Sequence, residues 1–304
     1  MRRFLPLLFL FCGCDDSPQR AEVAVSPKPA AQELVSTPEF SGENAYVHCA
    51  AICAMGPRYS GSPAYEQQLQ YLEKHLRAYG WQTERNSFSA PNGIQMNNLR
   101  AFRSTTPCPL LLSCHIDTKV NIAPGFESAD DGASGAAVLL ELARTLCDDR
   151  VELIFLDGEE AFARNMSETD GLYGSRFDVA RRGAQLPRWQ INLDMVGGRN
   201  KTIAIPILDT SDYMYRHYSN AVRSLGYSEE KWSVWPGGYL DDHLPYLEAG
   251  VESLNLIAVF TGSNWWHTAR DNMSRICPRS LHESGCMTRQ LINQLLSEAA
   301  ADAP

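Results

Sequence analysis

The sequence predicts an α/β fold: a single domain with three α/β/α layers around a central mixed, mostly parallel, twisted sheet. Five short apolar runs have the composition of buried parallel strands. They occupy residues 109–117, 151–157, 189–196, 202–208 and 251–260. A segment rich in Ala and Leu, 132–146, separates the first two runs and has the length of a helix. This order predicts a βαβ crossover in a sheet that helices cover on both faces.

An amphipathic helix is expected ahead of the first of these strands, within residues 62–81. Its apolar side chains recur at alternating steps of four and three residues, which draws one buried stripe on a helix. They are Tyr65, Leu69, Leu72, Leu76 and Tyr79. Ser62 can cap this helix, Pro63 suits its first turn and Gly80 suits its end. We interpret this helix as structural.

The first 40 residues precede the predicted domain, 41–300. Residues 1–13 combine two arginines with an apolar run that is too short to span a bilayer, which is typical of an export signal. The letters FCGC at 11–14 resemble a bacterial lipoprotein cleavage box with Cys14 as the lipidated residue. Residues 14–40 are rich in Pro and predict a flexible tether. We therefore expect an exported bacterial protein that is periplasmic or a membrane-anchored lipoprotein.

The net charge and the cysteine content limit the kinds of partner and metal site that this protein can have. The formal net charge is −9 and no basic stripe is present, which argues against binding of nucleic acid. Membrane contact is expected only through the lipid anchor, and we expect a monomer. Of the nine cysteines, Cys12 lies in the signal and Cys14 in the lipoprotein box; the remaining odd number and the lack of a CxxC pair argue against a structural zinc site. A disulfide after export, for example Cys277–Cys286, is compatible with the sequence, which does not assign the pairing.

Acidic and imidazole side chains follow several predicted strands directly. The stretch LIFLDGEEAF, 153–162, places carboxylates immediately after an apolar strand, and functional residues of α/β sheets gather at such strand ends. Catalytic zinc is bound by imidazole nitrogens and carboxylate oxygens and keeps one position open. The candidate ligands and acids are His115, Asp117, Asp130, Asp131, Glu159, Glu160, Asp194, Asp241, Asp242, His243 and His267.

Each candidate also has a purely structural interpretation. Asp130 or Asp131 could cap the helix at 132–146, and His115 could be an ordinary core histidine. Glu159 and Glu160 could lie in a solvated loop, but two like charges beside an apolar strand are costly unless a cation or a proton lies between them. The structural interpretation explains each residue singly and explains their joint occurrence poorly.

Seven motifs, in order along the chain, resemble the zinc aminopeptidase superfamily and, within it, the glutaminyl-peptide cyclotransferases (glutaminyl cyclases). They are CHIDT, ADDGASGAAVLLELAR, FLDGEEAF, GLYGSRF, NLDMVG, DDHLPYLEAGV and WWHTARDN, spread over residues 114–272. The earlier GPRYSGSP, 56–63, is similar to the first segment of that superfamily's domain. As an ordered set these motifs are highly specific, and they cover nearly the whole predicted domain.

The resemblance implies one Zn²⁺ held by Asp131, Glu160 and His267. It implies catalytic roles for Glu159, Asp194 and Asp241, and a substrate-binding role for Trp266. In aminopeptidases with two metals, His115 and Asp194 would bind a second zinc that Asp131 bridges. In the cyclases the equivalent of Asp194 belongs instead to a hydrogen-bonded acid network.

Details of the motifs favour the cyclase over the aminopeptidase. Asp241 stands where aminopeptidases usually carry Ser, and Trp266 directly precedes the proposed ligand His267. The sequence departs from the cyclase pattern after EEAF, where residues 163–170 contain no tryptophan. It also has Gly262 at a phenylalanine position and Ala136 at the position of a cysteine that pairs with the equivalent of Cys114 in vertebrates. Trp265 could wall the pocket in place of the missing aromatics.

The resulting expectation is an enzyme that cyclises N-terminal glutaminyl residues of peptides or proteins to pyroglutamate and releases ammonia. The alternative is a zinc aminopeptidase that hydrolyses N-terminal residues with the same side chains. A lipid-anchored binding protein with an inactive site is the least favoured hypothesis, because none of the proposed ligands and bases is missing. The number of bound metal ions separates the two enzymes.

Overall fold

The computed structural model describes residues 38–301. The predicted export signal, Cys14 and all but the last residues of the tether lie outside the described residues. The first described helix, α1 (Gly42–Cys53), begins after Ser41, whose hydroxyl accepts a hydrogen bond of 3.2 Å from Asn44 N. Within the described residues, no helix has the length and apolar character that a membrane crossing requires.

Eight strands form one mixed sheet within residues 38–301. They are β1 (Gln82–Ser89), β2 (Gln95–Phe102), β3 (Leu110–His115), β4 (Val151–Leu156), β5 (Trp189–Asp194), β6 (Ile203–Pro206), β7 (Trp232–Trp235) and β8 (Glu252–Ala258). Their order across the sheet is β1-β2-β4-β3-β5-β8-β6-β7. The four central strands β4, β3, β5 and β8 run parallel, so their carboxyl ends meet at one edge of the sheet.

The two sides of the sheet depart from the parallel arrangement. β1 and β2 pair antiparallel with each other, and β2 pairs antiparallel with β4. The run 202–208 was expected as a further buried parallel strand; it forms β6, which pairs antiparallel with β8 and parallel with β7. Apolar composition reports that a strand is buried but carries no information about its direction.

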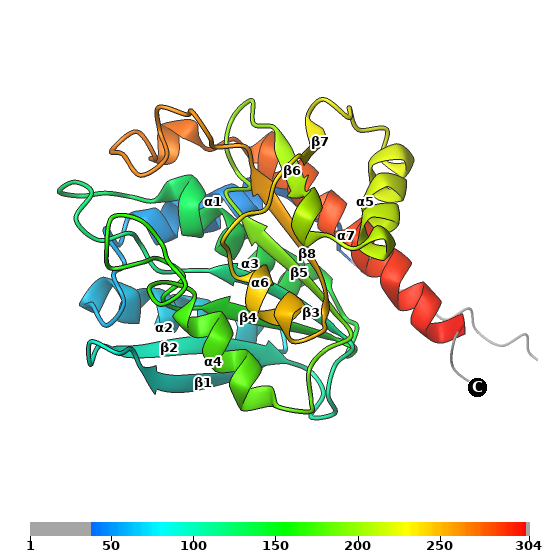
Figure 1. Cartoon of the computed structure of the whole chain (residues 1–304), viewed down its shortest axis with the longest axis horizontal. Coiled ribbons are helices and arrows are strands. Elements are labelled where there is room, and N and C mark those ends of the chain that lie inside the picture. The colour runs from blue at the N-terminus through cyan, green and yellow to red at the C-terminus, as the bar shows by residue number, and fades with distance from the viewer. Residues whose placement is uncertain (1–37, 302–304) are drawn as a thin grey trace, which may run out of the picture. The chain divides into compact units, whose positions relative to one another are not determined.

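Helices cover both faces of the sheet (Figure 1). One layer holds α4 (Tyr173–Arg182) and α6 (His243–Glu248), which lie in front of the sheet in this view. The helices of the other layer are α1, α2 (Pro63–Ala78), α3 (Gly135–Thr145), α5 (Asp212–Ser224) and α7 (Pro278–Ala301). The predicted three-layer α/β/α domain with a mixed sheet is confirmed.

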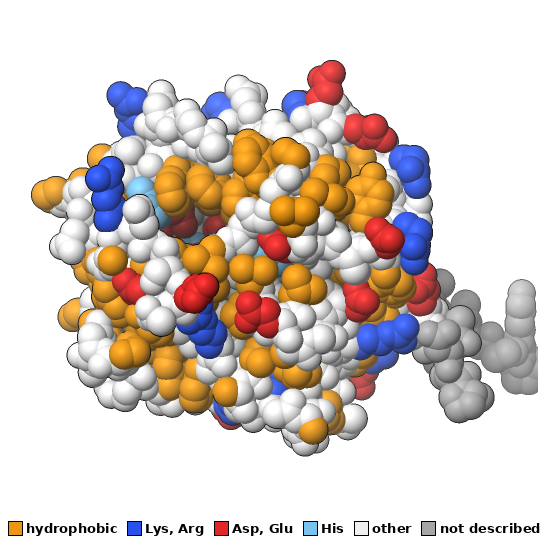
Figure 2. All heavy atoms as spheres, in the orientation of Figure 1, with side chains coloured by type: hydrophobic (Ala, Val, Ile, Leu, Met, Phe, Trp, Pro, Cys, Tyr) orange, Lys and Arg blue, Asp and Glu red, His pale blue; other side chains and the backbone are white. Residues whose placement is uncertain are grey.

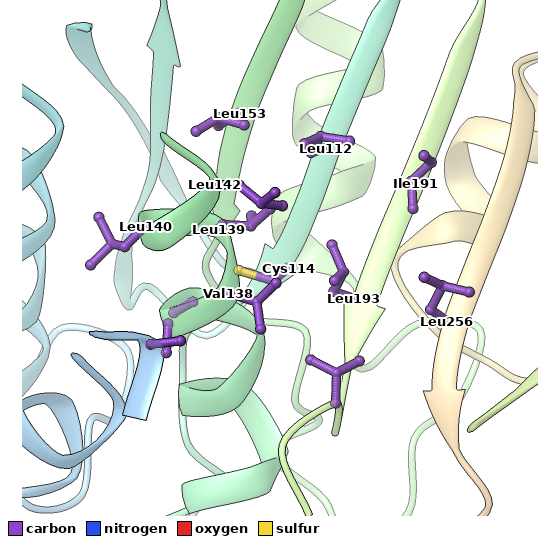
Figure 3. Close-up of a cluster of buried hydrophobic side chains, with 14 of the residues drawn as sticks. Leu112, Cys114, Val138, Leu139, Leu140, Leu142, Leu153, Ile191, Leu193 and Leu256 are labelled. Carbon is purple, nitrogen blue, oxygen red and sulfur yellow. The ribbon is translucent and has the colours of Figure 1, made fainter. Parts of the chain in front are cut away.

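The main core lies between the sheet and α3. In Figure 3, Leu139 and Leu142 of α3 point toward Leu112 and Cys114 of β3, and all four are fully buried. Burial of an aliphatic side chain of this size contributes about 1.5–3 kcal/mol to stability. A smaller cluster, which includes Leu111 and Tyr246, fills the space on the α4 and α6 side. Because both faces of β3 are covered, all six of its residues are buried and its sequence, LLLSCH, is mostly apolar.

The structure confirms the helix predicted within residues 62–81 as α2. Ser62 caps it by accepting a hydrogen bond of 3.1 Å from Tyr65 N, and Leu69, Leu72 and Leu76 are fully buried on its inner face. All seven described cysteines, Cys277 and Cys286 included, are free thiols. The example disulfide Cys277–Cys286 is therefore not formed.

Candidate active site

His115 and Asp117 are placed by the end of β3. His115 is its last residue and is 1% exposed. Its Nε2 atom lies 3.1 Å from Asp131 Oδ1 and 3.2 Å from Asp194 Oδ1. Three segments that are distant in the sequence therefore meet at this imidazole.

Asp131 is presented by a kinked turn, Ala129–Ser134, that precedes α3; the backbone of Asp131 (φ −82°, ψ 96°) is not helical. The carboxylate of Asp271 fixes this turn by accepting hydrogen bonds from Asp130 N (2.8 Å) and Asp131 N (3.1 Å). Gly132 has a φ of +95°, and a Cβ at this position would lie 3.0 Å from Asp117 O and 3.1 Å from His115 Cε1. The turn thus requires glycine to bring the Asp131 carboxylate against His115.

Glu159 and Glu160 follow β4 and are held by Asp117. The two oxygens of Asp117 accept hydrogen bonds from Glu159 N and Glu160 N, each at 3.1 Å. Asp117 thereby fixes the backbone of both glutamates without engaging their carboxylates. Both glutamates line the cavity, but only Glu160 approaches His267, with Oε1 at 3.1 Å from His267 Nε2. The two adjacent glutamates therefore have different neighbours.

His267 completes the arrangement from the segment that follows β8. Its backbone has a φ of +50°, and its Nε2 atom also lies 3.4 Å from Asp131 Oδ2. The Trp266 ring stacks on the imidazole with ring centres 3.9 Å apart. A non-glycine residue at positive φ is uncommon and indicates that the surrounding structure holds it there.

The ligand atoms form two groups that could hold a metal ion. One group is Asp131, Glu160 and His267; the other is His115, Asp131 and Asp194. Within each group the atoms lie within 4.8 Å of one another, and Asp131 belongs to both. The buried atoms Asp131 Oδ2 and His115 Nδ1 have no hydrogen-bond partner among the described residues. Imidazole and carboxylate donors in this arrangement fit zinc.

The electrostatics of the site also fit a cation. Burial, with the charge of neighbouring carboxylates, raises the pKa of Glu159, Glu160 and Asp194. Burial alone would lower the pKa of His267, but its contacts with Asp131 and Glu160 raise it to about 10. Carboxylates packed together out of water are destabilised unless positive charge lies among them. A divalent ion bound between these side chains would supply that charge.

Asp241 lies in the same cavity and is held by two amide side chains. Its oxygens accept hydrogen bonds from Asn192 Nδ2 at 3.1 Å and from Asn255 Nδ2 at 2.7 Å, and Asp242 N donates to it at 2.6 Å. Burial, together with the charge of Asp241, raises the pKa of Asp194. Asp194 and Asp241 line the same cavity.

The cavity has a volume of about 250 Å³ and combines an acidic floor with apolar walls. Figure 2 shows acidic atoms at the bottom of a hollow whose rim is largely hydrophobic. The walls include Met166, Tyr239, Leu240, Phe260 and Trp266. The suggestion that Trp265 walls the pocket in place of the missing aromatics is wrong. Trp265 is 7% exposed in the core, with the Arg275 guanidinium 3.5 Å from its ring centre.

Other acidic candidates have structural roles. Asp130 Oδ1 accepts a hydrogen bond from Gly197 N, and Asp242 accepts one from Ser175. His243 lies 3.7 Å from Asp209 and belongs to neither metal group. Sequence reasoning missed Lys119, whose Nζ atom is 3.4 Å from Glu160 Oε2. Its position two residues after Asp117, just beyond a predicted strand, could have identified it as a site residue.

Comparison with known proteins agrees with this geometry. Residues 99–292 match the pattern of peptidase family M28. Over 270 residues the chain is 32% identical to a glutaminyl-peptide cyclotransferase-like protein of Bos taurus, covering 74% of this chain and 68% of that protein.

Two solved structures superpose closely on this chain. Glutaminyl cyclase of Porphyromonas gingivalis does so with a TM-score of 0.75 at 26% identity, over 84% of this chain and 99% of that one. A Zn-dependent exopeptidase of Parabacteroides distasonis does so with a TM-score of 0.76 at 25% identity, over the same shares. The chain belongs to peptidase family M28 and, within it, to the glutaminyl-peptide cyclotransferases.

Proposed function

We propose that this protein is a zinc-dependent glutaminyl cyclase that converts N-terminal glutaminyl residues of peptides or proteins to pyroglutamate. The observation that carries the proposal is Asp241, an acid that two asparagines hold in the cavity beside Asp194. An aminopeptidase would usually carry Ser at this position. The identity with cyclotransferases over most of the chain supports the same activity.

The proposed reaction joins two groups of one substrate residue inside the cavity. The α-amine of the substrate attacks the δ-carbonyl carbon of the same residue, a five-membered ring closes, and ammonia leaves. Because both groups belong to one residue, the enzyme needs to orient them and move protons more than to assemble reactants. The apolar walls, Trp266 among them, exclude water around the side chain of the substrate.

Glu159 is the proposed general base and acid. Its carboxylate lines the cavity, while its backbone is fixed through Asp117. Glu159 takes a proton from the attacking α-amine and returns it to the leaving nitrogen, so the proton count balances with release of ammonia. Asp194 and Asp241 share a proton and stabilise the tetrahedral intermediate and the leaving amide.

Asp131, Glu160 and His267 are the proposed ligands of one zinc ion. When bound there, zinc supplies a Lewis acid for the side-chain carbonyl. Asp271 and Asp117 hold two of these ligands by their backbone, so the site is rigid before metal binds. This preorganisation limits the entropy that metal binding costs.

The second group, His115, Asp131 and Asp194, favours one rival function. With a second metal there, the same cavity would serve an aminopeptidase, and the likeness to a Zn-dependent exopeptidase agrees with that alternative. Mass spectrometry of a Gln-Xaa-Xaa peptide incubated with the zinc-loaded enzyme separates the two. Loss of one ammonia from an intact chain is the expected result, whereas release of free glutamine would overturn the proposal.

We further propose that residues 1–13 direct export of the protein, which is then either periplasmic or, after cleavage before Cys14 and lipidation of that cysteine, anchored in a bacterial membrane. The resemblance of FCGC to a lipoprotein box supports this. Metabolic labelling with radioactive palmitate should mark the wild-type protein and not Cys14→Ser. Equal labelling of both would contradict the anchor. We propose a monomer, which light scattering of the domain 41–300 tests.

A further inference from the structure

The catalytic cavity continues into a second, larger depression of about 580 Å³. Five residues line both: Lys119, Arg164, Asn165, Trp266 and His267. If the N-terminal glutamine occupies the cavity, the rest of a peptide must leave through an opening. The shared residues mark the opening toward the second depression, so the residues after the glutamine pass Arg164.

Arg164 is the free cation on this path. The floor of the cavity carries Asp131, Glu159 and Glu160 among its acids. Lys119 is 3% exposed, donates a hydrogen bond to Ala161 O at 2.6 Å and lies 3.4 Å from Glu160 Oε2. Arg164, in contrast, is exposed, and no described residue bonds to its guanidinium. The charge of Lys119 is thus engaged inside the site, and the charge of Arg164 is available to a ligand.

The loop that carries Arg164 is fixed on both sides. Asp170 accepts hydrogen bonds from Phe162 N and Ala163 N, each at 2.8 Å, and from the Tyr173 hydroxyl at 2.9 Å. Ser167 pairs with Asp170 in a short bridge that closes the loop. The backbone immediately before Arg164 is therefore anchored, which keeps this residue in the part of the rim that both cavities share.

We propose that Arg164 binds a carboxylate on the residues that follow the N-terminal glutamine, either an acidic side chain at the second or third position or the terminal carboxylate of a short peptide. This rests on the proposed glutaminyl cyclase function and names its substrate class. The acidic floor of the cavity attracts the substrate's α-ammonium and would repel a carboxylate nearby. A guanidinium at the opening reverses that repulsion and can bind a carboxylate with two parallel hydrogen bonds.

This contact lies away from the reacting atoms. It is made equally in the ground state and the transition state, so its loss raises KM and leaves kcat little altered. For a partly exposed pair we expect about a fivefold preference for the acidic peptide, which shrinks as salt screens the charges.

Three peptides and three proteins test the proposal by ammonia release. The peptides are Gln-Glu-Ala-amide, its neutral match Gln-Gln-Ala-amide, and Gln-Gln-Ala with a free carboxyl terminus, which separates the two carboxylate sources. The proteins are wild type, Arg164→Gln and Arg270→Gln. Arg270 is a matched control, because it is an exposed arginine near His267 that lines neither cavity.

We expect the ratio of kcat/KM for an acidic to the neutral peptide to fall about fivefold in Arg164→Gln, through KM, and to persist in Arg270→Gln. Arg164→Lys should restore part of the ratio. Equal kcat/KM for all peptides in wild type, or a preference that survives in Arg164→Gln, would overturn the inference. Absence of ammonia release from every peptide would overturn the proposed function instead. In that case calorimetric binding of the same peptides to wild type and Arg164→Gln still decides the role of Arg164.

Discussion

At the scale of single residues, the site works by giving chemically identical side chains different neighbours. Glu159 and Glu160 share one anchor, Asp117, yet only Glu160 approaches His267. Asp130 and Asp131 share the anchor Asp271, yet only Asp131 reaches the imidazoles. In both pairs one carboxylate accepts hydrogen bonds from the two successive backbone N–H groups and so holds the backbone of both residues.

Glu159→Gln should therefore keep the metal and lose turnover. The amide preserves the shape of the side chain but cannot accept the proton, so we expect kcat to fall by about 10²–10⁴-fold. Metal analysis by plasma mass spectrometry and ammonia release measure the two effects separately. A variant that is metal-free, or as active as wild type, would contradict the division of roles between the two glutamates.

Asn255→Leu should impair the Asp241 side chain without touching the metal ligands. It removes the donor 2.7 Å from Asp241 Oδ2 and leaves a buried carboxylate oxygen with fewer partners, a change worth about 1–3 kcal/mol. We expect lower kcat and lower stability with metal content retained.

Ser113→Ala is the matched control for Asn255→Leu. Its hydroxyl donates to Asn192 Oδ1 at 2.7 Å and does not contact Asp241. Equal loss of kcat in both variants would show that the effect is general to the buried polar cluster.

The sequence predicted the site residues that directly follow strands. It did not predict the side chains that hold those residues in place by hydrogen bonds. Asp271 lies 141 residues along the chain from Asp130, whose backbone it holds. Asn255 lies 14 residues after Asp241, on the strand β8, where its sequence neighbours are apolar. Nothing local distinguishes an anchoring carboxylate from a surface one. The resemblance to the family supplied the ligand set that periodicity alone left open.

At the scale of elements, strand ends and the kinked turn before α3 create the site. β3, β4 and β5 deliver His115, Glu160 and Asp194 to one edge because they run parallel. The turn before α3 inserts Asp131 between them. Strands β1 and β2 could not be predicted from apolar runs, since β1 has one largely exposed face and a polar sequence, QTERNSFS. Helix α4 was not predicted for a similar reason: few of its residues are buried, so its sequence has no clear apolar pattern.

Gly132→Ala tests the turn. Both the positive φ and the contacts of 3.0–3.1 Å oppose a Cβ, so we expect destabilisation of about 1–3 kcal/mol together with weaker metal binding. Gly250→Ala is the matched control, because Gly250 has a φ of +87° and open space around it. Urea unfolding and zinc titration compare them. Similar zinc affinity in both variants would contradict the role of the turn in placing Asp131.

The packing of α1 on α2 predicts a pH effect far from the site. His48 of α1 lies against Tyr71 and His75 of α2, and burial followed by the charge of His75 lowers the pKa of His48 to about 4. Between the unfolded value of 6.5 and about pH 4 the unfolded chain binds a proton that the folded protein does not bind. Stability should therefore fall as pH drops through this window.

His48→Leu should remove part of this dependence. The contribution is about 1–3 kcal/mol, and urea unfolding at pH 7.5 and pH 4.5 measures it. The difference between the two pH values should be smaller in the variant than in wild type. An identical difference would assign the acid sensitivity to other groups.

At the scale of the whole molecule, the fold class was the part most fully predicted. The apolar runs, the helix at 132–146 and the βαβ order sufficed for a three-layer domain, because burial on both faces leaves a plain signal in sequence. The strand order and the antiparallel pairing of β6 with β8 could not be predicted from the sequence, because tertiary contacts rather than composition decide which strands pair.

Removal of metal should destabilise the whole domain, because the ligands Asp131, Glu160 and His267 join the turn before α3, the segment after β4 and the segment after β8. With zinc at about a thousand times its Kd, bound metal adds about 4 kcal/mol. For a domain of this size the melting temperature should fall on the order of 10 °C with chelator and recover with zinc. Differential scanning fluorimetry measures this, and an unchanged melting temperature would contradict the metal site.

The distances along the chain between Asp131, Glu160 and His267 govern when the metal can be acquired. A growing chain that ends before residue 267 lacks one of these ligands, and an unfolded chain has no preformed site. Zinc would therefore bind late in biosynthesis, after nearly all of the chain has been synthesised and folded. For a chain that crosses a membrane unfolded, the metal must come from the compartment of arrival.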